Sequence, residues 1–371
     1  AVVKISCLLL LWFAAPGSHV IFPAVLMILA TLAAEFSIVF NDSMISRLTS
    51  EQNIGKISNI AWGLGYLGGM IVLLAVVFLI ASDPDSKKTI LGLEPIFGLN
   101  ATTGEDARIT GPIAAIWYLL FILPMFLFTP DADKGLALRP AIRQGTGEIR
   151  QSLRDLLKNK ELTRFFIARM LYQDGLNGVI VLGGVFAAGM FGWVTMEIGL
   201  FGIFLNIVAI AGCAFAGWID LRLGSRTTIL IGLVFLLIGT IGIVSTTTSS
   251  TLFGTIELST SSSDAIFSTQ AEKAYLFFGF FIGLAFGPVQ ASSRAFLARN
   301  IEVSDSGKYF GLYAFTGRAT SFLATLSFST VTYLTGSAHI GMASLIVLLG
   351  LGGIILFTVP KQIARGASPL A

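Results

Sequence analysis

Long apolar runs separated by shorter polar segments dominate the chain. A membrane-spanning α-helix needs about 20 apolar residues, and it satisfies its own backbone hydrogen bonds where no water is available. Ten such runs are present, of which the first and fourth are short. They cover Val3–Ala15, His19–Phe40, Ile57–Ala81, Pro112–Phe128, Phe165–Met190, Ile198–Trp218, Thr227–Ser245, Tyr275–Ala298, Tyr309–Thr335 and Ile340–Val359. The pattern predicts an all-α, polytopic membrane protein with about ten spans.

Polar residues inside these runs follow a period of three helices. The first, fourth, seventh and tenth runs contain no ionisable or amide side chain at depth. The other runs carry Glu35, Tyr66, Asp174, Asn177, Asn206, Gln290 and Arg318, accompanied by Trp62 and Gln173. Such groups are costly in lipid, so we expect them to line a central cavity while every third helix contacts lipid. The seven residues named first are our candidates for substrate binding or proton coupling.

Depth within the runs separates these candidates from residues that reach the membrane surface. Asp174 and Arg318 each lie about nine residues into a run, or roughly 13 to 15 Å deep in a core about 30 Å thick. They could form a pair that a proton or solute breaks, or a permanent pair that holds helices together. Arg169 and Arg294 lie near run ends, so we expect their side chains to reach the interface.

Three other candidates have two interpretations each. Glu35 could be a proton site or a hydrogen-bonding partner between helices. Asn206 and Gln290 could contact the solute, although amides also form hydrogen bonds between membrane helices.

Composition supports a membrane protein and removes several other classes. Hydrophobic residues make up 54% of the chain, charged residues only 12%, and the mean hydropathy is +0.83. Cys7 and Cys213 both lie in apolar runs, without the spacing of a disulfide framework or a metal site. No set of residues with enzyme spacing is present. We therefore expect no enzyme activity, no cofactor, no metal and no nucleic-acid partner.

Charge placement predicts orientation. If the runs alternate in direction, seventeen of the 24 Lys and Arg residues lie on one side, four lie on the other, and three lie within runs. The positive-inside rule makes the richer side cytoplasmic, and the C-terminus with it. We expect a multi-pass protein that is a monomer.

An internal repeat indicates two related halves. Arg47, Gly55 and Lys56 recur as Arg299, Gly307 and Lys308 at a constant offset of 252 residues. If the second half has six helices, the first shows only its last four, and two helices precede Ala1. We expect an N-terminal half at 1–130, a cytoplasmic linker at 131–164 and a C-terminal half at 165–371. Within the linker, GEIRQSLRDLLKNK has helical spacing and predicts an amphipathic interfacial helix or, alternatively, a plain basic loop.

Several spaced segments carry a family resemblance. GKISNIAWGLGYLGG, which begins at Gly55 and has Asn59 where glycine is more usual, resembles a signature of the vacuolar amino-acid effluxers linked to autophagy and their bacterial relatives. LYQDG around Asp174, GPVQASSRAFLARN and GKYFGLYAFTGRATSF are similar to later motifs of that branch of the major facilitator superfamily. GWIDLRLGSR resembles the superfamily's gating loop, where Asp220, Arg222 and Gly224 fit and Leu221 replaces a second acid.

The resemblance implies the major facilitator fold, with two six-helix halves, and amino-acid efflux by alternating access. The small-molecule solute, a proton as coupling ion and the lipid bilayer are then the expected partners. The membrane that the resemblance implies is a bacterial inner membrane or, in a eukaryote, a vacuolar membrane. A transporter of another solute, such as a sugar, drug or lipid, and a non-transporting scaffold or sensor are the alternatives.

Overall fold

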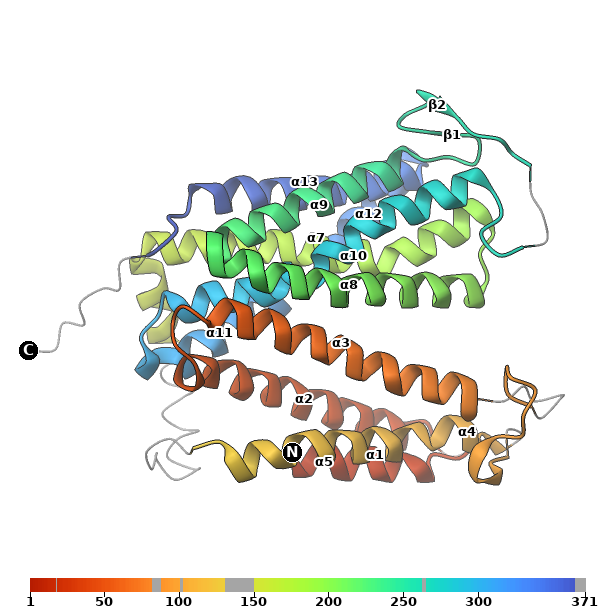
Figure 1. The fold of residues 1–371 in the computed structure, drawn as a ribbon, viewed down its shortest axis with the longest axis horizontal. Coiled ribbons are helices and arrows are strands. Elements are labelled where there is room, and N and C mark those ends of the chain that lie inside the picture. Colours follow the sequence, from red (N-terminus) through yellow and green to blue (C-terminus); the bar gives the residue numbers. More distant parts are fainter. Residues whose placement is uncertain (18, 82–87, 101–102, 131–149, 262–264, 364–371) are drawn as a thin grey trace, which may run out of the picture. The chain divides into compact units, whose positions relative to one another are not determined.

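The computed structural model of the chain is almost entirely helical (Figure 1). It describes residues 1–17, 19–81, 88–100, 103–130, 150–261 and 265–363. Within these residues, eight helices are long and apolar enough to cross a membrane. The sequence prediction of an all-α polytopic membrane protein is therefore confirmed.

Contacts divide the chain into two compact units. Unit 1 comprises Ala1–Asp42 and Gly68–Glu148, and unit 2 comprises Ser43–Leu67 and Ile149–Ala371. The boundary at Asp42 falls within α2 (Ile21–Leu48), and the boundary at Leu67 falls within α3 (Ile54–Leu79). The predicted halves were inferred from the sequence repeat, whereas these units are defined by contacts between residues. The division into two halves joined by a linker therefore stays a prediction.

Unit 1 is built around the packing of α1 (Val2–Leu10) on α5 (Thr110–Phe128). Gly111 allows this approach, since a Cβ there would lie 2.6 Å from the carbonyl oxygen of Leu8. Ser37 and Tyr118 hydrogen-bond through their hydroxyls at 2.8 Å and so link α2 to α5. The shorter elements of this unit are η1 (Leu11–Phe13), η2 (Ile96–Gly98) and α4 (Glu105–Arg108).

Unit 2 contains a bundle of long helices that run side by side (Figure 1). These are α7 (Lys160–Phe191), α8 (Thr195–Leu223), α9 (Ser225–Ser245), α10 (Gln270–Arg299) and α13 (Ala338–Thr358). Glycines allow the backbones to approach closely. A Cβ at Gly212 would lie 2.3 Å from the Leu284 carbonyl oxygen, and a Cβ at Gly352 would lie 2.8 Å from the Tyr172 backbone nitrogen. Such approaches replace the hydrophobic force that is absent between helices in lipid.

Short elements complete unit 2. A two-residue antiparallel hairpin, β1 (Ser250–Thr251) and β2 (Ile256–Glu257), follows α9. After α10 come η4 (Val303–Asp305), α11 (Ser306–Ala319) and α12 (Leu323–Thr335).

The structure does not confirm the count of ten spans. The first predicted span corresponds to Val2–Phe13, which is shorter than a membrane crossing. The ninth, predicted as one continuous helix, is divided into α11 and α12. At this break the Thr320 hydroxyl donates to the Thr316 carbonyl and the Ser321 hydroxyl donates to the Arg318 carbonyl. Hydroxyl groups that bond to nearby carbonyls in this way compete with the helical ladder.

Part of the predicted linker helix is present. Residues 150–158 are helical, with Leu156 buried and Leu153 and Leu157 exposed. The remainder of the predicted linker before them, 131–149, lies outside the described residues.

Candidate functional site

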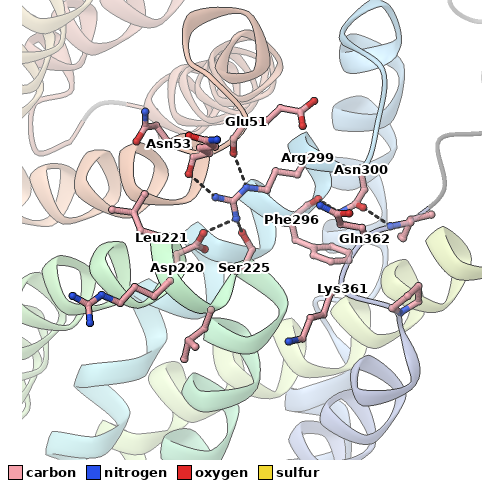
Figure 2. Close-up of a pocket in the computed structure, with 16 residues that line it drawn as sticks. Glu51, Asn53, Asp220, Leu221, Ser225, Phe296, Arg299, Asn300, Lys361 and Gln362 are labelled. Carbon is pink, nitrogen blue, oxygen red and sulfur yellow. Dashed lines mark hydrogen bonds and ion pairs between the residues drawn. The ribbon is translucent and has the colours of Figure 1, made fainter.

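The segment Gly217–Arg226, predicted to be a gating loop, forms the end of α8 and the start of α9 and contributes to a cluster of charge-assisted hydrogen bonds (Figure 2). Arg299, at the end of α10, donates from Nη1 to the Asp220 carboxylate and to the Ser225 hydroxyl, both at 2.6 Å. It also donates to the carbonyl oxygens of Glu51 at 2.9 Å and Gln52 at 3.1 Å. We call Arg299, Asp220, Ser225 and these two carbonyls the Arg299 cluster. It ties the turn before α3 to α8, α9 and α10.

Two glycines make the Arg299 cluster possible. Gly55, in the first turn of α3, leaves the space that the Asp220 carboxylate occupies, since a Cβ there would overlap that carboxylate. The Asp220 charge therefore lies at the N-terminus of α3, where the helix dipole is favourable to an anion. Gly224 joins α8 to α9 at a φ of +79°, which a residue with a Cβ adopts only with strain.

Other residues of the gating loop face outward. Arg222 is exposed and stacks on the Trp218 ring, with its Cζ 4.1 Å from the centroid. Leu221, which stands where the resemblance led us to expect a second acid, is also exposed. A cavity of about 1180 Å³ opens beside the cluster and is lined by residues that include Arg222, Asn300 and Lys361.

A second set of predicted residues forms a chain of hydrogen bonds across three helices. Trp62 on α3 donates to the Tyr66 hydroxyl at 2.9 Å, and Gln290 on α10 donates to the same oxygen at 3.4 Å. Gln173 on α7 donates to Gln290 at 3.4 Å and to Asn177 at 3.2 Å. We call these five residues the polar network. The structure thus brings together Tyr66, Asn177 and Gln290, which the sequence had placed only by depth.

Some hydrogen-bond donors of the polar network are not used within the network. Within the described residues, the Tyr66 hydroxyl accepts two hydrogen bonds and no acceptor is recorded for its own proton. Asn177 uses only its carbonyl oxygen, and its side chain is partly exposed. The two hydrogen bonds of 3.4 Å are also at the long limit for amide donors. Replacing them with hydrogen bonds to a ligand therefore costs little free energy.

Asp174 lies one residue beyond Gln173 but is directed at the break between α11 and α12. Its Oδ2 accepts a hydrogen bond of 2.7 Å from the Ala324 N–H, in the first turn of α12. Its Oδ1 is buried and has no hydrogen-bond partner among the described residues. Asp174 thus caps a helix from a neighbouring helix, and the pair with Arg318 that we considered is not formed in this structure.

The other predicted residues do not join these groups in the recorded contacts. Asn206 donates to the Gly202 carbonyl of its own helix at 3.0 Å. Arg318 is exposed in the last turn of α11. Glu35 lies on the part of α2 that belongs to unit 1 and is half-buried.

Comparison with known proteins places this geometry in a family. The family model described as "Vacuole effluxer Atg22 like" matches residues 1–367. The chain belongs to this family. The resemblance read from the sequence motifs is thereby confirmed.

Relatives of this Atg22-like chain come from bacteria and fungi. It is 20% identical to the uncharacterized MFS-type transporter YxiO of Bacillus subtilis, over 89% of this chain and 69% of the relative. It is 20% identical to autophagy-related protein 22 of Cryptococcus neoformans, over 79% of this chain. The match spans 48% of that fungal relative's length.

Solved structures confirm the fold. A variant of the E. coli fucose:proton symporter FucP matches with a TM-score of 0.67 at 12% identity, over 97% of this chain and 83% of that one. A FucP structure in the outward conformation matches with a TM-score of 0.64 at 12% identity, over 96% and 80%. The Atg22-like chain therefore has the major facilitator fold. It is an integral, multi-pass membrane transporter and not an enzyme.

Two arginines of this Atg22-like chain are buried, contrary to the expectation from their positions near the span ends. Arg169 and Arg294 were expected to reach the membrane surface, but their exposed fractions are only 7% and 6%. Arg294 donates to the hydroxyl and the carbonyl of Ser58, at 3.0 and 3.1 Å, and its Cζ lies 5.0 Å from the Trp62 ring centroid. Their spacing of four residues from Gln173 and Gln290 was the signal that could have placed them.

Proposed function

We propose that this chain exports amino acids by alternating access, with the polar network as the central part of the solute site. The observation that carries the proposal is that network: five hydrogen-bonding side chains from α3, α7 and α10, all of them uncharged. A small polar solute can exchange for its long bonds and use the donors that remain on Tyr66 and Asn177.

Both signs of charge lie beside the network, as recognition of a zwitterion requires. Asp174 follows Gln173 directly and is buried, with an exposed fraction of 2%. Arg169 and Arg294 each lie one helical turn from a glutamine of the network. A sugar carries no charged groups at neutral pH, so this arrangement favours an amino acid over that alternative.

Asp174 is our candidate for proton coupling. Its carboxylate has one recorded hydrogen bond and one buried oxygen without a partner in the described part of the chain. A proton on that oxygen would neutralise a buried charge while the bond to Ala324 remains. The E. coli symporter of similar fold is a fucose:proton symporter. For this chain we propose a proton as the coupling ion.

The proposed orientation places the Arg299 cluster and the C-terminus in the cytoplasm. It follows from the excess of Lys and Arg in the loops at that end. The proposed membrane is the bacterial inner membrane, or the vacuolar membrane in a eukaryote, and the proposed assembly is a monomer.

The test is solute counterflow in proteoliposomes that contain the full-length protein, with a panel of L-amino acids, sugars and lipophilic amines. We expect exchange of amino acids and no exchange of the other solutes. Exchange confined to sugars or amines, or no exchange of any solute, would contradict amino-acid transport.

Asp174→Asn tests proton coupling in the same vesicles. The amide oxygen can still accept the Ala324 N–H, so the fold should survive. Solute exchange should weaken but remain measurable, because one of the charges beside the network is lost. Acceleration of net amino-acid flux by a pH gradient should disappear. Asp174→Leu removes the cap as well, and the unsatisfied N–H should lower the stability of the protein by about 1–3 kcal/mol. Undiminished pH-driven flux in Asp174→Asn would remove Asp174 from the coupling mechanism.

A further inference from the structure

Arg169 is a buried cation held in a fixed position between α7 and α11. Its Nη1 donates to the Tyr313 carbonyl at 2.6 Å, and its Cζ lies 3.3 Å from the centroid of the Tyr313 ring. Gly317, one turn further along α11, leaves room for the guanidinium, since a Cβ there would lie 3.0 Å from Nη1. The Tyr313–Gly317 face of α11 therefore fits a guanidinium group and orients it.

No carboxylate neutralises this guanidinium among the described residues. The recorded contacts of Arg169 are with the neutral groups of Tyr313, and its Nε is buried without a hydrogen-bond partner in the part of the chain that is described. A buried charge is normally paired, because its desolvation is otherwise uncompensated. A mere tie between α7 and α11 would not need a permanent charge, since a neutral donor could bond the same carbonyl.

The place of Arg169 relates it to the polar network. It precedes Gln173 by four residues on α7, and residues at this spacing share one face of a helix. On α10, Arg294 follows Gln290 by four residues in the same way. Because Gln173 and Gln290 are hydrogen-bonded and the two helices run in opposite directions, both arginines lie one turn, about 6 Å, toward the same end. The neutral network therefore has a positively charged region at one end.

We propose that Arg169 binds the carboxylate of the transported solute. The inference rests on the proposed function, and it identifies the group that distinguishes an amino acid from an amine. A guanidinium matches a carboxylate with two parallel N–H donors, and a group whose position is fixed by Tyr313 and Gly317 binds without first losing conformational freedom. Arg294 adds positive potential at the same depth along the helices, and its hydrogen bonds to Ser58 hold its guanidinium against α3.

The experiment compares each L-amino acid that the protein exchanges with its α-carboxamide. The two differ only at the carboxylate and both keep the ammonium group. The full-length protein is reconstituted, and the measurement is the concentration of each compound that halves counterflow of the labelled amino acid. For the unaltered chain we expect the acid to compete at least about tenfold better than the amide, as loss of a charged hydrogen bond predicts.

Arg169→Gln should abolish this preference, so that the half-inhibiting concentrations of acid and amide agree within about twofold. Arg169→Lys should retain part of the preference, because lysine keeps the charge but lacks the paired N–H donors of a guanidinium. Arg164→Gln is the matched control, because Arg164 is an exposed arginine on the same helix. Gly317→Ala keeps Arg169 but crowds its guanidinium, and should weaken the preference in a chain that retains the charge.

The outcomes separate this proposal from the proposed function. If the unaltered protein exchanges no amino acid, the proposed function fails. If it prefers acids over amides and the Arg169→Gln and Arg169→Lys variants keep the same preference, Arg169 is not the carboxylate site while amino-acid transport stands. Should Arg169→Gln not fold, Arg169→Lys and Gly317→Ala decide the matter, and a wild-type preference in both would overturn the proposal.

Discussion

Asn59 shows how one side chain fits the contact between α3 and α10. It is completely buried, and its amide nitrogen donates to the Gly55 carbonyl at 2.9 Å and to the Ser292 hydroxyl at 3.0 Å. Nearby, the Ser58 hydroxyl donates to the Ala291 carbonyl at 2.6 Å. A residue with two donors can thus stand where the family resemblance led us to expect glycine, because its nitrogen finds an acceptor on each helix.

Gly55→Ala should destabilise the protein. The added Cβ would overlap the Asp220 carboxylate, so either that carboxylate or the start of α3 must move, at a cost of about 1–3 kcal/mol. The measurement is the Tm of the purified full-length protein. Gly65→Ala on the same helix is the control, since nothing lies within 4 Å of a Cβ there. An unchanged Tm for Gly55→Ala would show that the cluster does not depend on this close approach.

The helix at residues 150–158 is joined to the start of α11 by an ion pair. The Lys308 ammonium donates to the Asp155 carboxylate at 2.8 Å, and both side chains are partly exposed. That hydrogen bond holds the pKa of the Asp155 carboxyl below its ordinary value of 3.8. Burial lowers the pKa of Lys308, but the bond to Asp155 and neighbouring negative charge outweigh it and raise that pKa.

The pair should make docking of residues 150–158 sensitive to acid. A carboxyl with a lowered pKa contributes stability above its ordinary pKa and loses it as the pH falls through the folded value. Hydrogen-exchange protection of 150–158, corrected for intrinsic rates, should therefore be constant near neutral pH and fall below about pH 4. Asp155→Asn should show lower protection without this acid dependence. Identical pH profiles in the two proteins would exclude the pair as the cause.

At the scale of the bundle, the Arg299 cluster joins the turn before α3 to α8, α9 and α10. Arg299 bonds to the turn before α3 and to Asp220 and Ser225, whereas Arg226 bonds only to the Leu356 and Phe357 carbonyls among its recorded hydrogen bonds. The alternating access that we propose would separate α3 from α8 and α10 when this end opens. Under the proposed function, we expect the bonds of Arg299 to break in that change.

Arg299→Ala should therefore favour opening of this end. Cys213 reports on it, because its side chain is completely buried and faces Gly63 and Gly287 from α8. In a Cys7→Ser background, alkylation of Cys213 should accelerate about tenfold, as loss of charged hydrogen bonds predicts. Arg226→Ala is the control and should leave the rate unchanged. Equal rates for the two variants would contradict a gating role for Arg299.

The sequence by itself determined the class of this protein and which polar residues lie at depth in its helices. Hydropathy determines which segments can be helices in lipid, because each helix satisfies its own backbone whatever its neighbours are. The spacing of polar residues also selected Tyr66, Asn177 and Gln290, since a polar group at depth must face protein or water. Both inferences depend on one helix at a time.

Only the tertiary structure decided how helices use those residues. Matched depth allowed a pair between Asp174 and Arg318, but the break at residues 320–322 offers an unsatisfied N–H at Ala324, and the Asp174 carboxylate accepts it. Distance from a span end suggested an exposed Arg169, but Tyr313 and Gly317 on a different helix enclose it. A side chain's partners come from neighbouring helices, so hydropathy determines the depth of a residue but not the group that it binds.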